Sequence, residues 1–254
     1  MNSAQRKTAL IKWQLATVTE TLSETPTART LVLDVPDWMG HLAGQHVDVR
    51  LTAEDGYQAQ RSYSIGSAPE DARVALTIER LEDGEVSLYL CDELRVGDQL
   101  ELRGPIGGHF VWSVEMCGPL LLVAGGSGIV PLMSMLRHRH VSQADGNATA
   151  RGALPTWLLY SSRRWEAIIY RDELAHIAAT DETLTVTHTL TREAPEGWTG
   201  FRRRIDRAML SELWPAAYQP RVFVCGPTSL VESVAAGFVE LGHNPQLVKL
   251  ERFG

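Results

Sequence analysis

Three short segments of the chain carry groups that could bind a phosphorylated cofactor. They are RSYS at 61–64, GGSG at 125–128 and CGP at 225–227. An arginine can hold a pyrophosphate through two parallel hydrogen bonds, and glycines let backbone N–H groups come close to phosphate oxygens. The first segment lies in the first half of the chain and the other two lie in the second half, which predicts a separate phosphate-binding site in each half.

The segment at 61–64 suits FAD, which carries a pyrophosphate, a ribityl chain and a flat ring. Residues two apart on a strand share a face, so Arg61 and Tyr63 are expected to point the same way. Arg61 would hold the pyrophosphate, and Tyr63 would pack on the ring or the ribityl chain. The hydroxyl of Ser64 is the candidate donor near flavin N5, where charge develops as hydride arrives. An ordinary barrel strand with a surface arginine is the alternative.

A second phosphate contact is predicted at 83–94, DGEVSLYLCDEL. Gly84 permits a tight turn, and Ser87 is a candidate cap for a short helix over 87–94. The N–H groups at such a helix start form an anion site, which would complement Arg61. A plain hairpin turn followed by a capped helix explains the same residues.

The glycine run at 125–128 joins an apolar strand to a helix that begins near Pro131. Proline suits the first turn of a helix, and the helix start adds the positive end of its dipole. The last position of the usual G-x-G-x-x-G fingerprint is a proline here. A glycine turn needed only for close strand–helix packing is the alternative.

The segment at 225–227 again places a strand end beside a helix start. Cys225 lies where a nicotinamide could reach it, and it has no neighbouring cysteine with which to exchange a disulfide. A small buried apolar residue is the alternative role of Cys225.

Arginines are frequent between residues 163 and 204, and the pair Thr191-Arg192 follows a predicted strand. That position suits the 2′-phosphate of NADPH, which arginine can clamp. Arg202, Arg203 and Arg204 could act in the same way or dock an acidic redox partner. For most of these arginines, which also include Arg163, Arg164 and Arg171, a solvated basic face is the preferred interpretation.

Two kinds of hydrophobic pattern predict the strands and helices on which these segments lie. Up to about residue 113, apolar and polar residues alternate with period two between frequent turns, which predicts an antiparallel β-barrel domain over 1–113. The predicted strands are 30–36, 45–52, 61–67, 73–81 and 98–105.

From about residue 118, buried strands alternate with helices, which predicts a doubly wound parallel sheet of five strands in an α/β domain over 114–254. The predicted strands are 119–125, 156–162, 184–190, 221–226 and 246–251. The predicted helices are 129–139, 171–179, 204–214 and 228–242, and 141–155 is expected to be a surface loop.

Composition narrows the class of protein. The 254 residues carry a net charge of −7, which argues against a nucleic-acid partner, and 44% of them are hydrophobic, which suffices for a large core. No apolar stretch is long enough for a membrane span or a signal peptide, so a cytoplasmic location is expected. Three scattered cysteines favour a reducing compartment and cannot hold a plant-type iron–sulfur cluster, and no metal site is expected.

Together the motifs resemble the ferredoxin–NADP reductase superfamily from about Trp13 to Gly254. The ordered set R-x-Y-S, G-x-x-S, GPxG at 104–107, GGxGxxP and CGP carries the resemblance, together with the terminal ERFG. The chain is most similar to the bacterial reductases that supply oxygenases, such as the phenol hydroxylase and benzoate dioxygenase reductases.

The resemblance implies an FAD-dependent NAD(P)H oxidoreductase. The implied FAD-binding residues are Arg61, Ser62, Tyr63, Ser64, Gly84, Val86 and Ser87. The implied NAD(P)-binding residues are Gly126, Ser127, Gly128, Pro131, Thr191, Arg192, Cys225, Gly226 and Pro227. Ser64, Cys225 and Glu251 would stand at the reacting atoms, and Glu251 and Phe253 resemble a terminal segment that lies near the flavin.

The oxygenase reductases in this family carry a fused iron–sulfur domain that the sequence lacks. The expected acceptor is therefore a separate ferredoxin-like protein or a small diffusible molecule, with NADPH preferred to NADH. A reductase of free flavin or ferric chelates is the alternative enzyme, and a non-catalytic flavin-binding regulatory protein is the alternative of another class.

Overall fold

The first half of the chain forms an antiparallel six-stranded sheet that curves into a barrel. The computed structural model describes residues 11–144, 155–214 and 219–253. The strands of the barrel are β1 (Gln14–Thr25), β2 (Ala28–Asp34), β3 (His46–Thr52), β4 (Gln58–Ser64), β5 (Val74–Glu79) and β6 (Gln99–Ile106). Their order is β4-β3-β6-β1-β2-β5, and a bridge between Ile65 and Leu76 brings the two outer strands together. The predicted barrel is confirmed.

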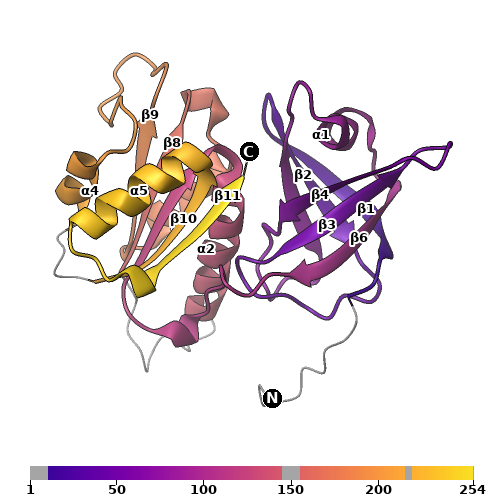
Figure 1. Ribbon diagram of the computed structural model, residues 1–254, viewed down its shortest axis with the longest axis horizontal. Helices are drawn as coiled ribbons and strands as arrows, with labels where there is room; N and C mark the ends of the chain where they lie inside the picture. The colour runs from indigo at the N-terminus through magenta and orange to yellow at the C-terminus, as the bar shows by residue number, and fades with distance from the viewer. Residues whose placement is uncertain (1–10, 145–154, 215–218, 254) are drawn as a thin grey trace.

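Alternating side chains build the interior of the barrel. Leu31 and Leu33 on β2 and Val47 and Val49 on β3 are fully buried, as period-two patterning requires. A short helix, α1 (Glu85–Leu88), continues into a π-helical turn (Tyr89–Glu93) beside the barrel (Figure 1). The helix predicted at 87–94 is thus present and begins earlier.

The second half is a parallel sheet with helices on both faces, as predicted (Figure 1). Its strands are β7 (Leu120–Gly125), β8 (Thr156–Ser162), β9 (Leu184–Leu190), β10 (Arg221–Pro227) and β11 (Val248–Phe253), in the order β11-β10-β7-β8-β9. Its helices are α2 (Ile129–Ala144), α3 (Arg171–Thr180), α4 (Arg207–Leu213) and α5 (Thr228–Glu240). Short 3-10 turns lie at Val114–Met116, Gly126–Gly128, Trp165–Ala167 and Pro245–Leu247.

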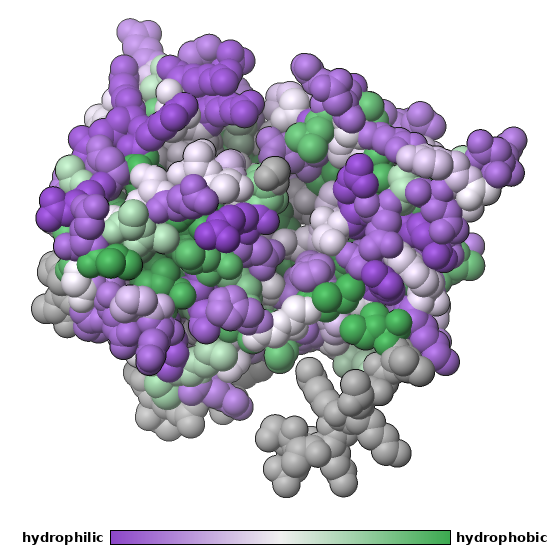
Figure 2. All heavy atoms as spheres, in the orientation of Figure 1, coloured by the Kyte–Doolittle hydropathy of each residue, from purple (hydrophilic) through white to green (hydrophobic). Residues whose placement is uncertain are grey.

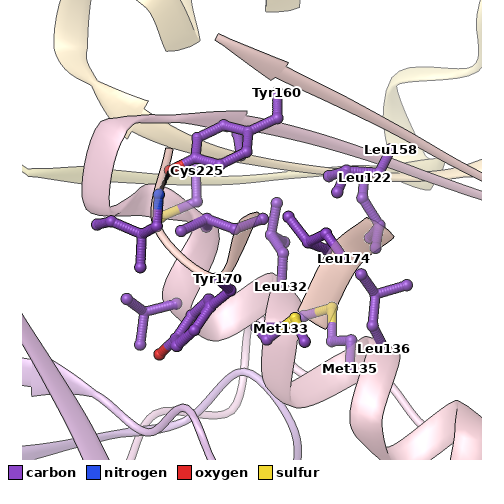
Figure 3. Packing of buried hydrophobic residues seen from close by; sticks show 14 of the residues in the cluster. Leu122, Leu132, Met133, Met135, Leu136, Leu158, Tyr160, Tyr170, Leu174 and Cys225 are labelled. Carbon is purple, nitrogen blue, oxygen red and sulfur yellow. Dashed lines mark hydrogen bonds between the residues drawn. The ribbon is translucent and has the colours of Figure 1, made fainter. Parts of the chain in front are cut away.

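Successive residues of the central strands bury against opposite faces of this sheet. On β7, Leu120 and Leu122 pack with α2 and α3, whereas Leu121 and Val123 pack with α4 and α5. Figure 3 shows the first of these layers, in which Leu132 and other side chains of α2 lie against the sheet. Burial on both faces explains the continuous apolar run of the strand.

Two parts of the predicted secondary structure differ from the structure. Strand β1 was not predicted, and α2 continues to Ala144 through the start of the expected surface loop at 141–155. The rest of that loop, up to residue 154, lies outside the described residues. No helix in the described part of the chain is long and apolar enough to cross a bilayer.

Candidate active site between the barrel and the parallel sheet

A cleft of about 460 Å³ lies where the barrel faces the carboxyl edge of the parallel sheet. In the space-filling view a furrow separates the two parts of the molecule (Figure 2). The volume is in the range of cofactor and ligand sites. The predicted site residues that line the cleft are Ser62, Ser64, Ser127, Cys225, Glu251 and Phe253. Segments that are far apart in the sequence, from Ser62 to Phe253, therefore meet in one place.

Strand β4 presents two chemically different faces. Tyr63 pairs with Val47 and Arg61 pairs with Val49, so both point to the side on which the barrel core lies. Ser64 pairs with His46 and points to the opposite side, into the cleft. The alternation predicted for the RSYS segment is confirmed.

Arg61 and Ser64 keep polar groups available for a ligand. Arg61 is exposed, and its guanidinium donates only to the carbonyl of Gln60, at 2.7 Å, among the described residues. The hydroxyl of Ser64 has no protein partner within the same part of the chain, whereas Ser62 donates to a carboxylate oxygen of Asp48 at 2.6 Å. Ser62 is therefore already engaged in the barrel.

Tyr63 is half-buried between these polar groups and the barrel core. Burial raises the pKa of its phenol to about 12, so the hydroxyl stays protonated at neutral pH. Its ring thus offers an apolar surface beside Arg61.

The turn at 84–87 is held together by its own side chains. The hydroxyl of Ser87 donates to the carbonyl of Gly84 at 3.0 Å and accepts from the N–H of Leu81 at 3.2 Å. Ser87 therefore does not cap the helix as predicted, because α1 begins at Glu85 with Gly84 as its N-cap and without a side-chain cap. The side chain of Val86 is buried in the barrel core. Only the backbone of this turn is placed to meet a phosphate.

The glycine loop after β7 packs tightly against the end of β10. A Cβ atom on Gly128 would lie 2.2 Å from the carbonyl oxygen of Cys225, so only glycine fits. Gly126 has a φ of +54°, in the left-handed region that favours glycine, and no Cβ there would clash. Close packing thus explains Gly128, and Gly126 and Ser127 are the loop residues free to face a ligand.

Pro131 is buried in the first turn of α2, where it was predicted to start the helix. Its side chain does not line the cleft. The predicted cofactor contact of Pro131 stays a prediction.

The final strands β10 and β11 supply the other wall of the cleft. Cys225 lies opposite Glu251 in their parallel register, and Gly226 and Pro227 lie opposite the two residues that follow. Burial raises the pKa of the Cys225 thiol well above its usual value, which fits a small apolar residue better than a reactive thiolate. Phe253 is 37% exposed at the end of this wall.

Glu251 is the most perturbed carboxyl group of the cleft. Burial raises its pKa from 4.5 to about 7. Within the described residues its carboxylate has no hydrogen-bond or ion-pair partner, so nothing in the protein offsets the loss of water. A carboxyl group balanced between its two protonation states near neutral pH is suited to proton transfer.

Two further residues, which no sequence motif indicated, lie at or beside the cleft. His46 lines the cleft beside Ser64, and burial lowers the pKa of its imidazole. Tyr160 supports the glycine loop, since its hydroxyl donates to the carbonyl of Gly126 at 3.0 Å and accepts from the N–H of Ile169 at 3.2 Å. Neither residue stands in a recognisable motif.

Thr191 and Arg192 lie at the carboxyl end of β9, as predicted. The hydroxyl and the N–H of Thr191 both donate to the carbonyl of Ser162. Arg192 and Arg163 are exposed and make no side-chain hydrogen bond or ion pair with any described residue. Arg164 is different, since it pairs with Glu193 at 2.8 Å.

Most of the other arginines are occupied by protein groups. Arg171 pairs with Asp172, Arg202 donates to the carbonyl of Trp198, and Arg203 pairs with two carboxylates. A solvated face explains these three.

Comparison with known proteins identifies both parts of the molecule. An oxidoreductase FAD-binding domain matches residues 15–112, and an oxidoreductase NAD-binding domain matches residues 122–236. Ferredoxin–NADP reductase B of Sorangium cellulosum is 36% identical over 243 residues, which cover 90% of this chain and 92% of that protein. The chain belongs to the ferredoxin–NADP reductase family. The barrel is thus the FAD-binding domain of this chain, and the parallel sheet is its NAD-binding domain.

The chain spans about two thirds of the length of several other curated relatives that it matches. The glycine betaine monooxygenase reductase subunit of Chromohalobacter salexigens is 32% identical over 238 residues, and the match covers 92% of the chain but 62% of that subunit. Among solved structures, the FAD/NAD-binding domain of nitric oxide dioxygenase from Vibrio cholerae superposes with a TM-score of 0.81 over 95% of the chain and 98% of that domain, at 22% identity. This superposition confirms the two-domain fold.

Proposed function

We propose that the protein oxidises NAD(P)H and passes the electrons, one at a time, to a separate acceptor of the ferredoxin type. The observation that carries the proposal is the meeting of Ser64, from the FAD-binding barrel, with Cys225 and Glu251, from the edge of the NAD(P)-binding sheet, in one cleft. We take residues 1–113 and 114–254 as the two functional domains.

The residues of the barrel fit FAD. Arg61 and the backbone of the turn at 84–87 are proposed to hold the pyrophosphate, since Arg61 is paired with no acid among the described residues and α1 has no side-chain cap. Tyr63 would cover the ring system, and Ser64 would donate toward N5 from the cleft side. Val86 and Ser87 would contribute only backbone groups.

The residues of the parallel sheet fit a nicotinamide dinucleotide. Gly126 and Ser127, held from behind by Tyr160 and Gly128, are proposed to cradle its pyrophosphate. Cys225, Gly226 and Pro227 would border the nicotinamide. Bound FAD would supply the redox chemistry, taking up a hydride and giving up single electrons. The cleft between the two domains would hold the two rings side by side.

Glu251 and His46 are proposed to manage the proton. Glu251 can hold or release a proton near neutral pH because burial raises its pKa to about 7. Ser64 lies directly opposite His46 on the neighbouring strand, and both line the cleft, so the imidazole is placed where it could take up a proton.

NADPH is the proposed donor. At the carboxyl end of the sheet, where the 2′-phosphate would lie, Arg192 and Arg163 present two guanidinium groups that are paired with no residue in the described ranges. Glu193 would repel this phosphate, but Arg164 already neutralises it.

An anaerobic titration tests the proposed function. The purified protein, loaded with FAD, is mixed with NADPH and separately with NADH while the visible flavin spectrum is followed. We expect rapid bleaching with a lower half-saturating concentration for NADPH. A yellow protein that neither donor bleaches would exclude an oxidoreductase and leave the flavin-binding regulatory role.

The acceptor is identified in a second experiment with the reduced protein. Saturable reoxidation by a bacterial [2Fe–2S] ferredoxin, faster than reoxidation by free FMN or a ferric chelate at equal concentration, would support the proposal. The reverse order would favour the flavin or ferric-chelate reductase.

A further inference from the structure

The end of strand β4 is fastened to helix α2 by hydrogen bonds between the two domains. Arg137 donates from Nη1 to the carbonyl of Gly66 at 2.6 Å, and Ser134 donates to the carbonyl of Ser67 at 2.7 Å. Gly66 follows Ser64 closely in the sequence, and α2 begins directly after the glycine loop at 126–128. These two hydrogen bonds therefore connect the segment after β4 with the helix that follows the glycine loop at 126–128. We call this contact between the two domains the joint.

Tyr170 crosses the same joint from the NAD(P)-binding domain. It is 3% exposed, and its hydroxyl forms a hydrogen bond with the hydroxyl of Thr77 on β5. Thr77 is bonded in turn to the hydroxyl of Thr30 at 2.7 Å, and Thr30 donates to Glu24 at 2.6 Å. The hydrogen bonds of Tyr170, Thr77 and Thr30 thus form a continuous series that extends from the NAD(P)-binding domain through strands β5 and β2 of the barrel.

Arg137 and Tyr170 form a single unit. The guanidinium of Arg137 lies 4.8 Å from the centre of the Tyr170 ring and makes two hydrogen bonds with Glu173, at 2.6 and 2.8 Å. A Cβ atom on Gly66 would lie 2.8 Å from the hydroxyl oxygen of Tyr170, so the joint has no spare room. Figure 3 shows the Tyr170 hydroxyl directed away from the labelled leucines of its own domain.

The backbone of Tyr170 provides independent evidence. Its φ is +58°, a left-handed conformation that costs energy for any residue other than glycine. Such a residue persists where its surroundings hold it in place, and strain of this kind gathers at functional sites. The side chain of Tyr170 thus reaches the barrel from a backbone conformation that few residues adopt.

We propose that Tyr170, with Arg137 and Thr77, is a positioning residue that sets the separation of flavin and nicotinamide. This inference rests on the proposed function. Hydride transfer requires reacting atoms about 3–3.5 Å apart, and a misplacement of about 1 Å can slow it about a hundredfold. Loosening the joint would move Ser64 and the glycine loop independently, while each domain kept its own cofactor contacts.

Two hydroxyl deletions test the inference from opposite sides of the joint. Tyr170→Phe removes the hydroxyl from the NAD(P)-binding domain, and Thr77→Val removes its partner from the barrel. Thr77→Ser keeps the hydroxyl and is the conservative variant. Thr19→Val is the matched control, since the Thr19 hydroxyl donates to Val32 within the barrel at 3.1 Å, away from the joint.

The first readout is the limiting rate of flavin reduction at saturating NADPH in stopped flow. We expect Tyr170→Phe and Thr77→Val to slow it at least tenfold, with the dissociation constant of FAD changed less than twofold. Thr77→Ser and Thr19→Val should keep the wild-type rate. A merely structural role would instead lower FAD affinity or thermal stability and leave the limiting rate intact.

The second readout is amide hydrogen exchange of the FAD-loaded protein, which needs no turnover. The N–H of Gly66 donates to Ala75 at 2.8 Å, and we expect it to exchange several-fold faster in Tyr170→Phe. Wild-type rates of both reduction and exchange in the two variants would overturn this inference alone. A wild-type protein that neither donor reduces would overturn the proposed function and this inference with it.

Discussion

Replacing Glu251 by glutamine should make the protein more stable at alkaline pH. Burial raises the pKa of this carboxyl group from 4.5 to about 7, and no group in the described part of the chain forms a hydrogen bond or an ion pair with it. Below pH 4.5 the group is protonated in both the folded and the unfolded chain, so its stabilising contribution is complete. As the pH rises through the folded pKa, that contribution is lost, because only the folded state resists ionisation.

The magnitude follows from the difference between the two pKa values, about 7 minus 4.5, or about 2.5. At about 1.4 kcal/mol for each pKa unit this is about 3.4 kcal/mol for a fully buried group. Glu251 is partly exposed, so solvent screening reduces the expected loss to about 2 kcal/mol. In a chain of this size that corresponds to about 4–8 °C in Tm.

The assay is thermal unfolding of the wild type and of Glu251→Gln between pH 5 and pH 8, at a fixed excess of FAD. The Tm of the variant minus that of the wild type should increase by about 4–8 °C across this range. Glu232→Gln, on the exposed side of α5, is the control and should show no such trend. A difference between variant and wild type that does not change with pH would refute the argument that burial controls this carboxyl group.

Three substitutions test predicted cofactor-binding residues that do not line the cleft itself. Arg61→Ala should weaken FAD binding about tenfold or more, because a charge-assisted hydrogen bond to phosphate is lost. Equilibrium dialysis with flavin fluorescence measures this affinity. Full flavin occupancy of the variant at limiting FAD would contradict the proposed role of Arg61. Arg192→Ala should lower the ratio of kcat/KM for NADPH over NADH about tenfold, whereas Arg207→Ala, a surface arginine paired with Glu240, should leave it unchanged. Gly128→Ala should lower the free energy of unfolding by about 2 kcal/mol or more, since its Cβ would lie 2.2 Å from the carbonyl oxygen of Cys225. Urea unfolding measures this change. A midpoint equal to that of the wild type would show that the loop can move aside.

Most helices and strands could be predicted from the sequence because the spacing of their apolar residues matches the pattern of burial in the structure. Strand β7 is buried at every position and β2 alternates, and both were located from the sequence. Strand β1 was missed because Ala16 and Val18 are the only fully buried positions among its twelve residues, and threonines and glutamates fill most of the rest. Its place is set by pairing with β2 and β6, which no local pattern reveals.

The sequence contained a usable signal for His46. The turn centred on Asp55 and Gly56 joins β3 to β4, and the register runs from Thr52 opposite Gln58 to His46 opposite Ser64. Counting back from that turn would have placed the imidazole beside Ser64. The Ser87 cap failed for a local reason, since its hydroxyl found partners within its own turn.

The contacts between the domains could not be predicted from the sequence. Tyr170 and Thr77 are separated by 93 residues, and each is an unremarkable member of its own element. The neighbouring positions of Cys225 and Glu251 depend on the order of strands in the sheet, which the alternation of strands and helices leaves open. The positions of these residues relative to one another could be known only from the resemblance to the family or from the structure.

The fit between α2 and the loop after β4 also limits how the two domains can be recombined. Each domain is recognised separately by family, which suggests interchangeable modules. The carbonyls of Gly66 and Ser67 nevertheless require donors at the spacing that α2 of this chain provides. A chimaera that joined this barrel to the parallel-sheet domain of a relative would keep both cofactor pockets and lose their alignment, unless the grafted helix carried the same pair of donors.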